Sequence, residues 1–119
     1  MIYKESKNIT EWVAGDGTLL KELFHPLNEN ITTSYSLAEA RIPAGGQSVP
    51  HRLTGSELYY FLSGEAVIFV NDEMKSVKKG DLVWVPPNAS QYVVNNADVD
   101  LVFICIVDPY WKKEDEILE

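Results

Sequence analysis

Apolar and polar residues alternate along most of this chain, and turn residues interrupt the alternation every eight to twelve positions. This spacing is typical of a β-sandwich or β-barrel built from short strands. No amphipathic helical pattern of useful length competes with it. We therefore predict an all-β fold, with strands over 18–24, 33–42, 56–62, 66–70, 73–77, 82–85, 89–94 and 99–107.

Turn signals separate these strands. Asn71-Asp72 stands between two alternating segments, as expected of a two-residue hairpin. The last strand, 99–107, is almost continuously apolar and contains Cys105, the only cysteine. A disulfide within the chain is therefore excluded, and a buried, inert thiol is expected.

The length and net charge of the chain limit the classes of partner that it can bind. At 119 residues, of which 45% are apolar, the chain has the size of one domain. A net charge of −8 argues against nucleic acid or an anionic membrane surface as partner, because both require clustered Lys and Arg. The sequence has no apolar run long enough to span a membrane and no secretion signal near Met1, so a cytoplasmic location is expected.

The tail is the most acidic part of the chain. It runs from Lys112 to Glu116 and is followed by Ile117 and Leu118. A short surface helix that packs one or two apolar residues is expected here, and a partner-binding tail is the alternative.

Two spaced motifs carry the candidate chemistry. The first follows the pattern G-x5-H-x-H-x3-E-x6-G, with a leucine at the second histidine position; its residues are Gly45, His51, Leu53, Glu57 and Gly64. The second follows G-x5-P-x-G-x2-H-x3-N, with asparagine and glutamine at the second glycine and the histidine; its residues are Gly80, Pro86, Asn88, Gln91 and Asn95. Asparagine tolerates the left-handed backbone that this turn requires, so its presence is a structurally mild change.

The two motifs resemble those of the cupin superfamily. The resemblance implies a jelly-roll barrel of antiparallel strands, with one metal held at its mouth by three histidines and a glutamate. It also implies a single domain over 1–119, with a core barrel at about 33–107, N-terminal strands within 1–24 and a tail at 108–119. Leu53 and Gln91 each replace one imidazole, so the evident ligands are His51, Glu57 and Gln91.

The period of two in a strand provides a check that is independent of the family. If His51 points inward, Leu53 does too, and Glu57, Tyr59 and Phe61 share one face of the next strand. Tyr59 is therefore a candidate to act with Glu57 in catalysis, by donating a hydrogen bond or a proton. The alternative for Tyr59 is an ordinary aromatic wall residue.

Other residues leave alternatives open. His25 either supplies a further imidazole from a loop over the barrel mouth or is an exposed turn residue before Pro26. Arg52 is expected to point away from His51. Trp12 and Trp84 are expected to pack internally or to form part of a dimer face.

The functional hypotheses follow from the ligand set. The first is a metal-dependent, non-redox enzyme that uses Zn, Mn, Fe or Ni on a small polar metabolite, in isomerase, epimerase or lyase chemistry. The alternatives are a metal-free module for a sugar or organic acid, in which His51 and Glu57 form a hydrogen-bonded pair, a cupin dioxygenase, and a filled structural barrel. A homodimer is also expected, with 11–14 and the apolar pairs 19–20 and 23–24 as candidate contact segments, and a monomer with these strands folded back is the alternative.

Overall fold

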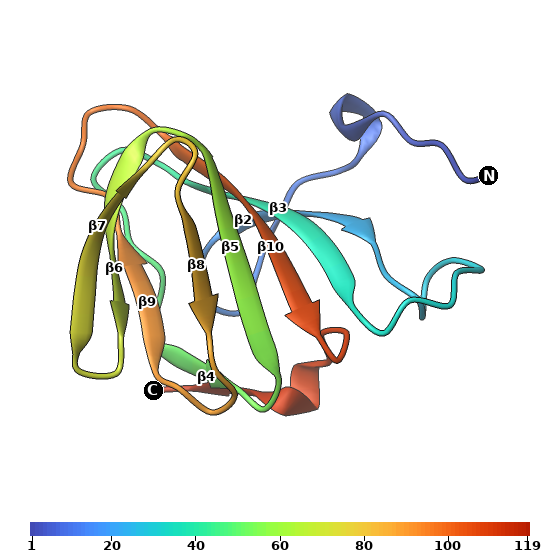
Figure 1. Cartoon of the computed structure of the whole chain (residues 1–119). Helices are drawn as coiled ribbons and strands as arrows, with labels where there is room; N and C mark the ends of the chain where they lie inside the picture. Colours follow the sequence, from blue (N-terminus) through green and yellow to red (C-terminus); the bar gives the residue numbers. More distant parts are fainter.

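Two antiparallel β-sheets face each other in the computed structural model, which describes all 119 residues (Figure 1). The strands are β1 (Trp12–Val13), β2 (Leu19–Phe24), β3 (Ser36–Ile42), β4 (His51–Leu53), β5 (Ser56–Ser63), β6 (Glu65–Val70), β7 (Glu73–Lys78), β8 (Leu82–Val85), β9 (Gln91–Val94), β10 (Leu101–Asp108) and β11 (Glu116–Leu118). Two single turns of 3-10 helix, η1 (Ser6–Asn8) and η2 (Lys113–Asp115), complete the secondary structure. The all-β prediction is confirmed.

The chain passes back and forth between the two sheets. One sheet has six strands in the order β1-β2-β3-β10-β5-β8, and the other has five in the order β11-β4-β9-β6-β7. Because neighbours in each sheet are mostly distant in the sequence, both walls of the barrel depend on long-range pairing. No helix is long and apolar enough to cross a membrane.

Two asparagines adopt the left-handed backbone at turns. Asn71 (φ 51°) lies in the two-residue hairpin between β6 and β7, where Val70 pairs with Glu73. Asn88 (φ 66°) occupies the position where the second motif has a glycine. The hairpin and the mild effect of Asn88 were both predicted, because asparagine is among the residues that tolerate this conformation.

The tail differs from its expected form. Helix is limited to the turn η2, and the residues after it form β11, which pairs with β4. In the five-stranded sheet β4 has only one paired residue with β9, His51 with Gln91. The tail therefore covers a strand edge that would otherwise be open.

Alternate residues of β4, β5, β9 and β10 fill the space between the sheets, as the period of two predicted. Phe61, Ile42 and Leu101 are at most 2% exposed and belong to a cluster of 13 buried apolar residues. Cys105 is free and buried in the same cluster, as expected. The inward face is therefore apolar over most of its length, and the candidate site interrupts it.

Candidate metal and ligand pocket

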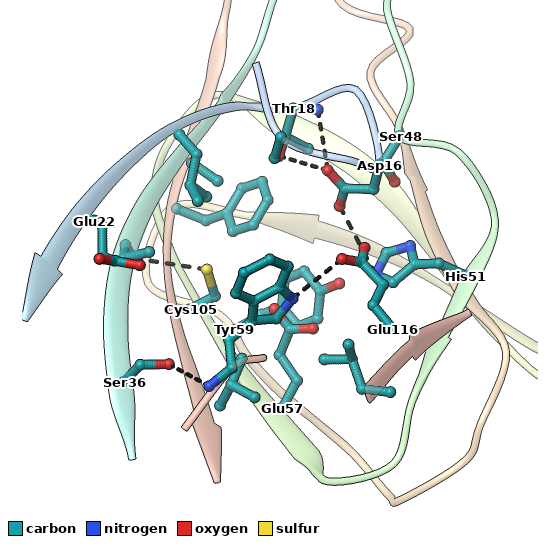
Figure 2. A pocket seen from close by; sticks show the side chains of 18 of the residues that line it. Asp16, Thr18, Glu22, Ser36, Ser48, His51, Glu57, Tyr59, Cys105 and Glu116 are labelled. Carbon is teal, nitrogen blue, oxygen red and sulfur yellow. Dashed lines mark hydrogen bonds and ion pairs between the residues drawn. The ribbon is translucent and has the colours of Figure 1, made fainter. Parts of the chain in front are cut away.

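A pocket opens between the sheets beside this core (Figure 2). Its cavity measures about 70 Å³, which is room for a few waters or for the polar end of a small ligand. The six-stranded sheet contributes inward residues of β2, β3, β5 and β10, and β4 and the tail contribute the opposite side. Three residues that the sequence selected, His51, Glu57 and Tyr59, line this pocket together.

Gln91 lies next to the pocket and is 2% exposed. It is not among the lining residues, and its side-chain oxygen accepts a short hydrogen bond from the Tyr59 hydroxyl. This bond occupies the hydroxyl of Tyr59 and the side-chain oxygen of Gln91. Burial, followed by the nearby Glu57, raises the pKa of Tyr59 well above its ordinary value, so this phenol stays protonated.

Glu57 is the buried acid of the site. Burial raises the pKa of its carboxyl to about 8, with smaller contributions from the charges of Asp16 and Glu116 and with opposing hydrogen bonds from Cys105 and Gln91. A carboxyl with this pKa is mainly protonated at neutral pH. Glu57 therefore offers the pocket a proton donor rather than a negative charge.

The ring of His51 is oriented by a hydrogen bond to the backbone. Its Nδ1 lies 2.8 Å from the Val49 carbonyl oxygen. Because a carbonyl can only accept, this nitrogen carries the hydrogen, as is usual for a metal-binding histidine that donates its other N–H. The second nitrogen, Nε2, faces the carboxylate of Asp16 at 3.8 Å. With its hydrogen on Nδ1, the ring presents the lone pair of Nε2 toward a carboxylate, an arrangement that a bound cation would stabilise.

A second carboxylate completes this cluster. The ligand atoms of Asp16, His51 and Glu116 all lie within 4.8 Å of one another (Figure 2). Asp16 is oriented through its other oxygen, which accepts hydrogen bonds from the backbone N–H and the hydroxyl of Thr18 at 3.1 and 2.7 Å. Glu116 accepts a 3.1 Å bond from the Trp111 indole. This set of one imidazole and two carboxylates could hold a metal ion.

Glu116 is placed by the pairing of β11 with β4. Its direct partner is Leu53, the residue that stands where the first motif carries its second histidine. Paired residues on one sheet face bring their side chains to about 5 Å, so a carboxylate from the tail lies beside the position that lacks an imidazole. Burial raises the pKa of Glu116, and so does Asp16, whereas His51 opposes the shift.

Asp16 and Glu116 were missed by the sequence analysis. Asp16 lies in a glycine-flanked turn, and Glu116 is one acid among several in the tail. Neither has a spacing that relates it to His51, because only the folded tail and the N-terminal turn bring them there. The acidic residues of the tail were the one available signal.

His25 does not take part in this cluster. It is 4% exposed, its Nε2 lies 2.7 Å from the Trp111 carbonyl oxygen, and its Nδ1 accepts a bond from the Leu27 N–H. Both earlier alternatives for His25, a further site imidazole and an exposed turn residue, are therefore wrong. Nε2 thus holds the segment that carries Trp111 into the pocket, and Nδ1 holds the loop of His25 itself.

Two other expectations concern Arg52 and the two tryptophans Trp12 and Trp84. Arg52 points outward and pairs with Glu119, as the alternation predicted. Trp84 and Trp12 are 60% and 41% exposed, so internal packing does not account for them.

With this geometry in view, comparison with known proteins gives the family. The model of the cupin domain matches residues 38–107, which is more than half of the chain. The chain therefore belongs to the cupin family. The predicted family and its jelly-roll type of barrel are confirmed.

Some relatives align with the whole chain and others with part of it. The uncharacterized protein MJ1618 of Methanocaldococcus jannaschii is 36% identical, over 100% of this chain and 96% of its own length. An oxalate-binding protein of Thermotoga maritima is 30% identical over 59% of each chain. Among solved structures, a predicted oxalate decarboxylase from T. maritima superposes with a TM-score of 0.80, at 21% identity, covering 91% of this chain and 99% of that one. At this identity the structure shows a shared fold.

Proposed function

We propose that this cupin binds a divalent metal ion through Asp16, His51 and Glu116 and uses it on a small polar molecule in non-redox chemistry. The observation that carries the proposal is the orientation of His51, whose free ring nitrogen faces two carboxylates while the other nitrogen is fixed on Val49. When bound, such an ion supplies Lewis-acid polarisation of a carbonyl or hydroxyl oxygen.

The chain's own residues supply the remaining chemistry. Glu57 is protonated near neutral pH and lines the pocket, so it is placed to donate a proton or a hydrogen bond to a ligand oxygen. Tyr59 lines the same wall and is oriented by its bond to Gln91. We therefore propose Glu57 and Tyr59 as the catalytic pair.

The ligand set predicted from the sequence, His51, Glu57 and Gln91, stays a prediction that shares His51 with the proposed set. The geometry favours Asp16 and Glu116 as the oxygen ligands. Gln91 already accepts the Tyr59 hydroxyl, and protonated Glu57 is a poor ligand until it loses its proton.

The types of metal-ligating side chain also rank the candidate reactions. Non-haem iron oxygenases use two histidines and one carboxylate. Here one histidine meets two carboxylates, and the other histidine of the chain, His25, is bound elsewhere. We therefore rank dioxygenase chemistry below Lewis-acid chemistry in an isomerase, epimerase or lyase.

A metal-free binding module is the second candidate. Its specific support is the same 3.8 Å approach of His51 to Asp16, because a protonated imidazole would satisfy both carboxylates without an ion. The oxalate-binding relative supports small-molecule binding in either case.

Metal binding separates these candidates. Zn²⁺ and Mn²⁺ are titrated into chelator-treated protein by calorimetry, with His51→Ala, Glu116→Gln and, as a matched control from the exposed part of the tail, Glu114→Gln. The proposal expects one ion per chain, loss of binding in His51→Ala, and an affinity reduced about 10- to 100-fold in Glu116→Gln. Glu114→Gln should bind as the parent does. Absence of binding to the parent protein would leave the metal-free module.

We also propose that the chain forms a homodimer through the outer face of the six-stranded sheet. There Tyr60, Leu82 and Trp84 are 42%, 63% and 60% exposed, and they adjoin the outward residues Leu58, Ile104 and Ile106. The exposed apolar area is on the order of 500 Å², at the upper end for a monomer, and about 800 Å² per partner is a standard interface. A second copy suits the patch because all six residues are uncharged whereas the chain carries a charge of −8.

Light scattering after size exclusion tests the dimer. We expect twice the 13.4 kDa chain mass, and the chain mass itself for Trp84→Lys. Met74→Lys, at a 65% exposed position on the other sheet, serves as the control and should remain dimeric. A 13.4 kDa species for the parent at all concentrations would exclude the dimer.

A further inference from the structure

The pocket has an end crowded with polar groups and a more apolar end. Figure 2 shows Asp16, His51 and Glu116 together on one side, with Cys105, Ser36 and the carboxylate of Glu22 on the other. Trp111 spans the two, because its backbone N–H donates to Ser36 at 2.9 Å and its indole to Glu116 at 3.1 Å. A ligand held at the cluster would therefore extend along Trp111 toward the apolar end.

Small residues of β3 create the space at the apolar end. Its inward positions are Ser36, Ala38, Ala40 and Ile42, and the first three line the pocket. On one side Ala40 pairs with Leu20 and Ala38 with Glu22, and on the other side Ala40 and Ala38 pair with Phe103 and Cys105. Larger side chains on the neighbouring strands thus surround the alanines of β3. This arrangement leaves room for the apolar part of a ligand.

The charge of the lining is negative. Four acids face the pocket, Asp16, Glu22, Glu57 and Glu116, and the lining has no Lys or Arg. Even with Glu57 protonated, the other three carboxylates outweigh the two positive charges of a divalent ion. Inside a partly buried site, a further negative charge is repelled more strongly than in water.

We propose that the pocket selects a ligand without net negative charge that joins a neutral oxygen-bearing end to a branched aliphatic or aromatic body. The inference rests on the proposed function, because the ion would hold the oxygen-bearing end. Such a ligand is an aldehyde, ketone, alcohol or amide, and dicarboxylates such as oxalate are disfavoured.

Four probes test charge and length separately. They are pyruvate, pyruvamide, 4-methyl-2-oxopentanoate and 4-methyl-2-oxopentanamide, titrated by calorimetry into Zn²⁺-loaded protein. The long amide should bind about tenfold or more tighter than the short amide, since it buries three more carbons. It should also bind about tenfold or more tighter than the long acid. The proposal is overturned if the acid binds as tightly as its amide, if length has no effect, or if no probe binds.

Filling the apolar end provides the matched variant. Ala38→Leu should remove the advantage of the long amide while the Zn²⁺ affinity and the binding of pyruvamide stay within about twofold. Ala38→Val replaces it if the leucine variant does not fold. Unchanged affinity for the long amide in the filled variant would contradict the proposal. If the protein binds no Zn²⁺, the proposed function fails. The long and short amides are then compared in the metal-free protein. Equal binding of the two amides there would also overturn this inference.

Discussion

The two ends of the barrel interior use the same strands but different side chains. On β5 the inward positions run from Glu57 through Tyr59 to Phe61, with exposures of 7%, 3% and 0%. Around Phe61 the neighbours are large and apolar, including Ile42 and Leu101. Around Glu57 they are acids and a histidine.

The backbone pattern is therefore common to both ends, and the residue types decide which end is filled. Burial of large apolar side chains stabilises the closed end. At the open end, alanines on β3 leave space and a buried carboxyl is retained at a cost in stability. This division suggests that stability resides mainly at the Phe61 end and chemistry at the Glu57 end.

The largest expected effect is at the closed end. Phe61→Ala should lower the free energy of unfolding by about 3 to 5 kcal/mol, because it opens a cavity in a fully buried cluster. Tyr59→Phe, one inward position away, should cost about 1 kcal/mol through its lost bond to Gln91. Urea unfolding measures both, and equal losses would refute the proposed division of roles.

Glu57 should make the parent protein less stable as pH rises. Its pKa is about 8 when folded and near 4.5 when unfolded, so between these values the folded state binds more protons. Stability should fall by about 1.4 kcal/mol per pH unit across this window from this group alone. In Glu57→Gln this contribution should be absent, so the decline should be smaller than in the parent. Chelator-treated samples of both proteins, compared by urea unfolding from pH 5 to 8, provide the measurement, and parallel curves would count against a buried, protonated Glu57.

A smaller effect is expected where the N-terminal turn meets the site. Asp16→Asn should weaken Zn²⁺ binding about 10-fold or more, whereas Asp98→Asn, at an exposed loop position, should leave it unchanged. Neither change should alter the unfolding free energy of the metal-free protein by more than about 1 kcal/mol. Calorimetric titration and urea unfolding test the pair, and equal Zn²⁺ affinities would exclude Asp16 as a ligand.

The smallest effect is expected from filling the open end. Ala38→Leu places apolar atoms in an existing space, so its unfolding free energy should change by less than about 1.5 kcal/mol in either direction. The same substitution at Ala89, which is 4% exposed within the packed cluster and does not line the pocket, should cost about 1 to 3 kcal/mol. Thermal or urea unfolding compares the two variants, and a larger loss at Ala38 would mean that the open end is already packed.

Much of this arrangement could be predicted from the sequence. The alternation along β5 gave the inward positions, and the spaced motifs gave the family and the central place of His51. The short strand β11 was not predicted, because three residues carry too little pattern. Asp16 and Glu116 were missed for a related reason. The fold of the N-terminal turn brings Asp16 to His51, and pairing between the tail and β4 brings Glu116 there, and no local signal encodes either approach.

The most direct test of the central claim is an anomalous-difference map from crystals of the protein grown with Zn²⁺. The account predicts one strong peak within coordination distance of the side chains of Asp16, His51 and Glu116. A peak bounded instead by Glu57 and Gln91, or no peak at His51, would contradict it.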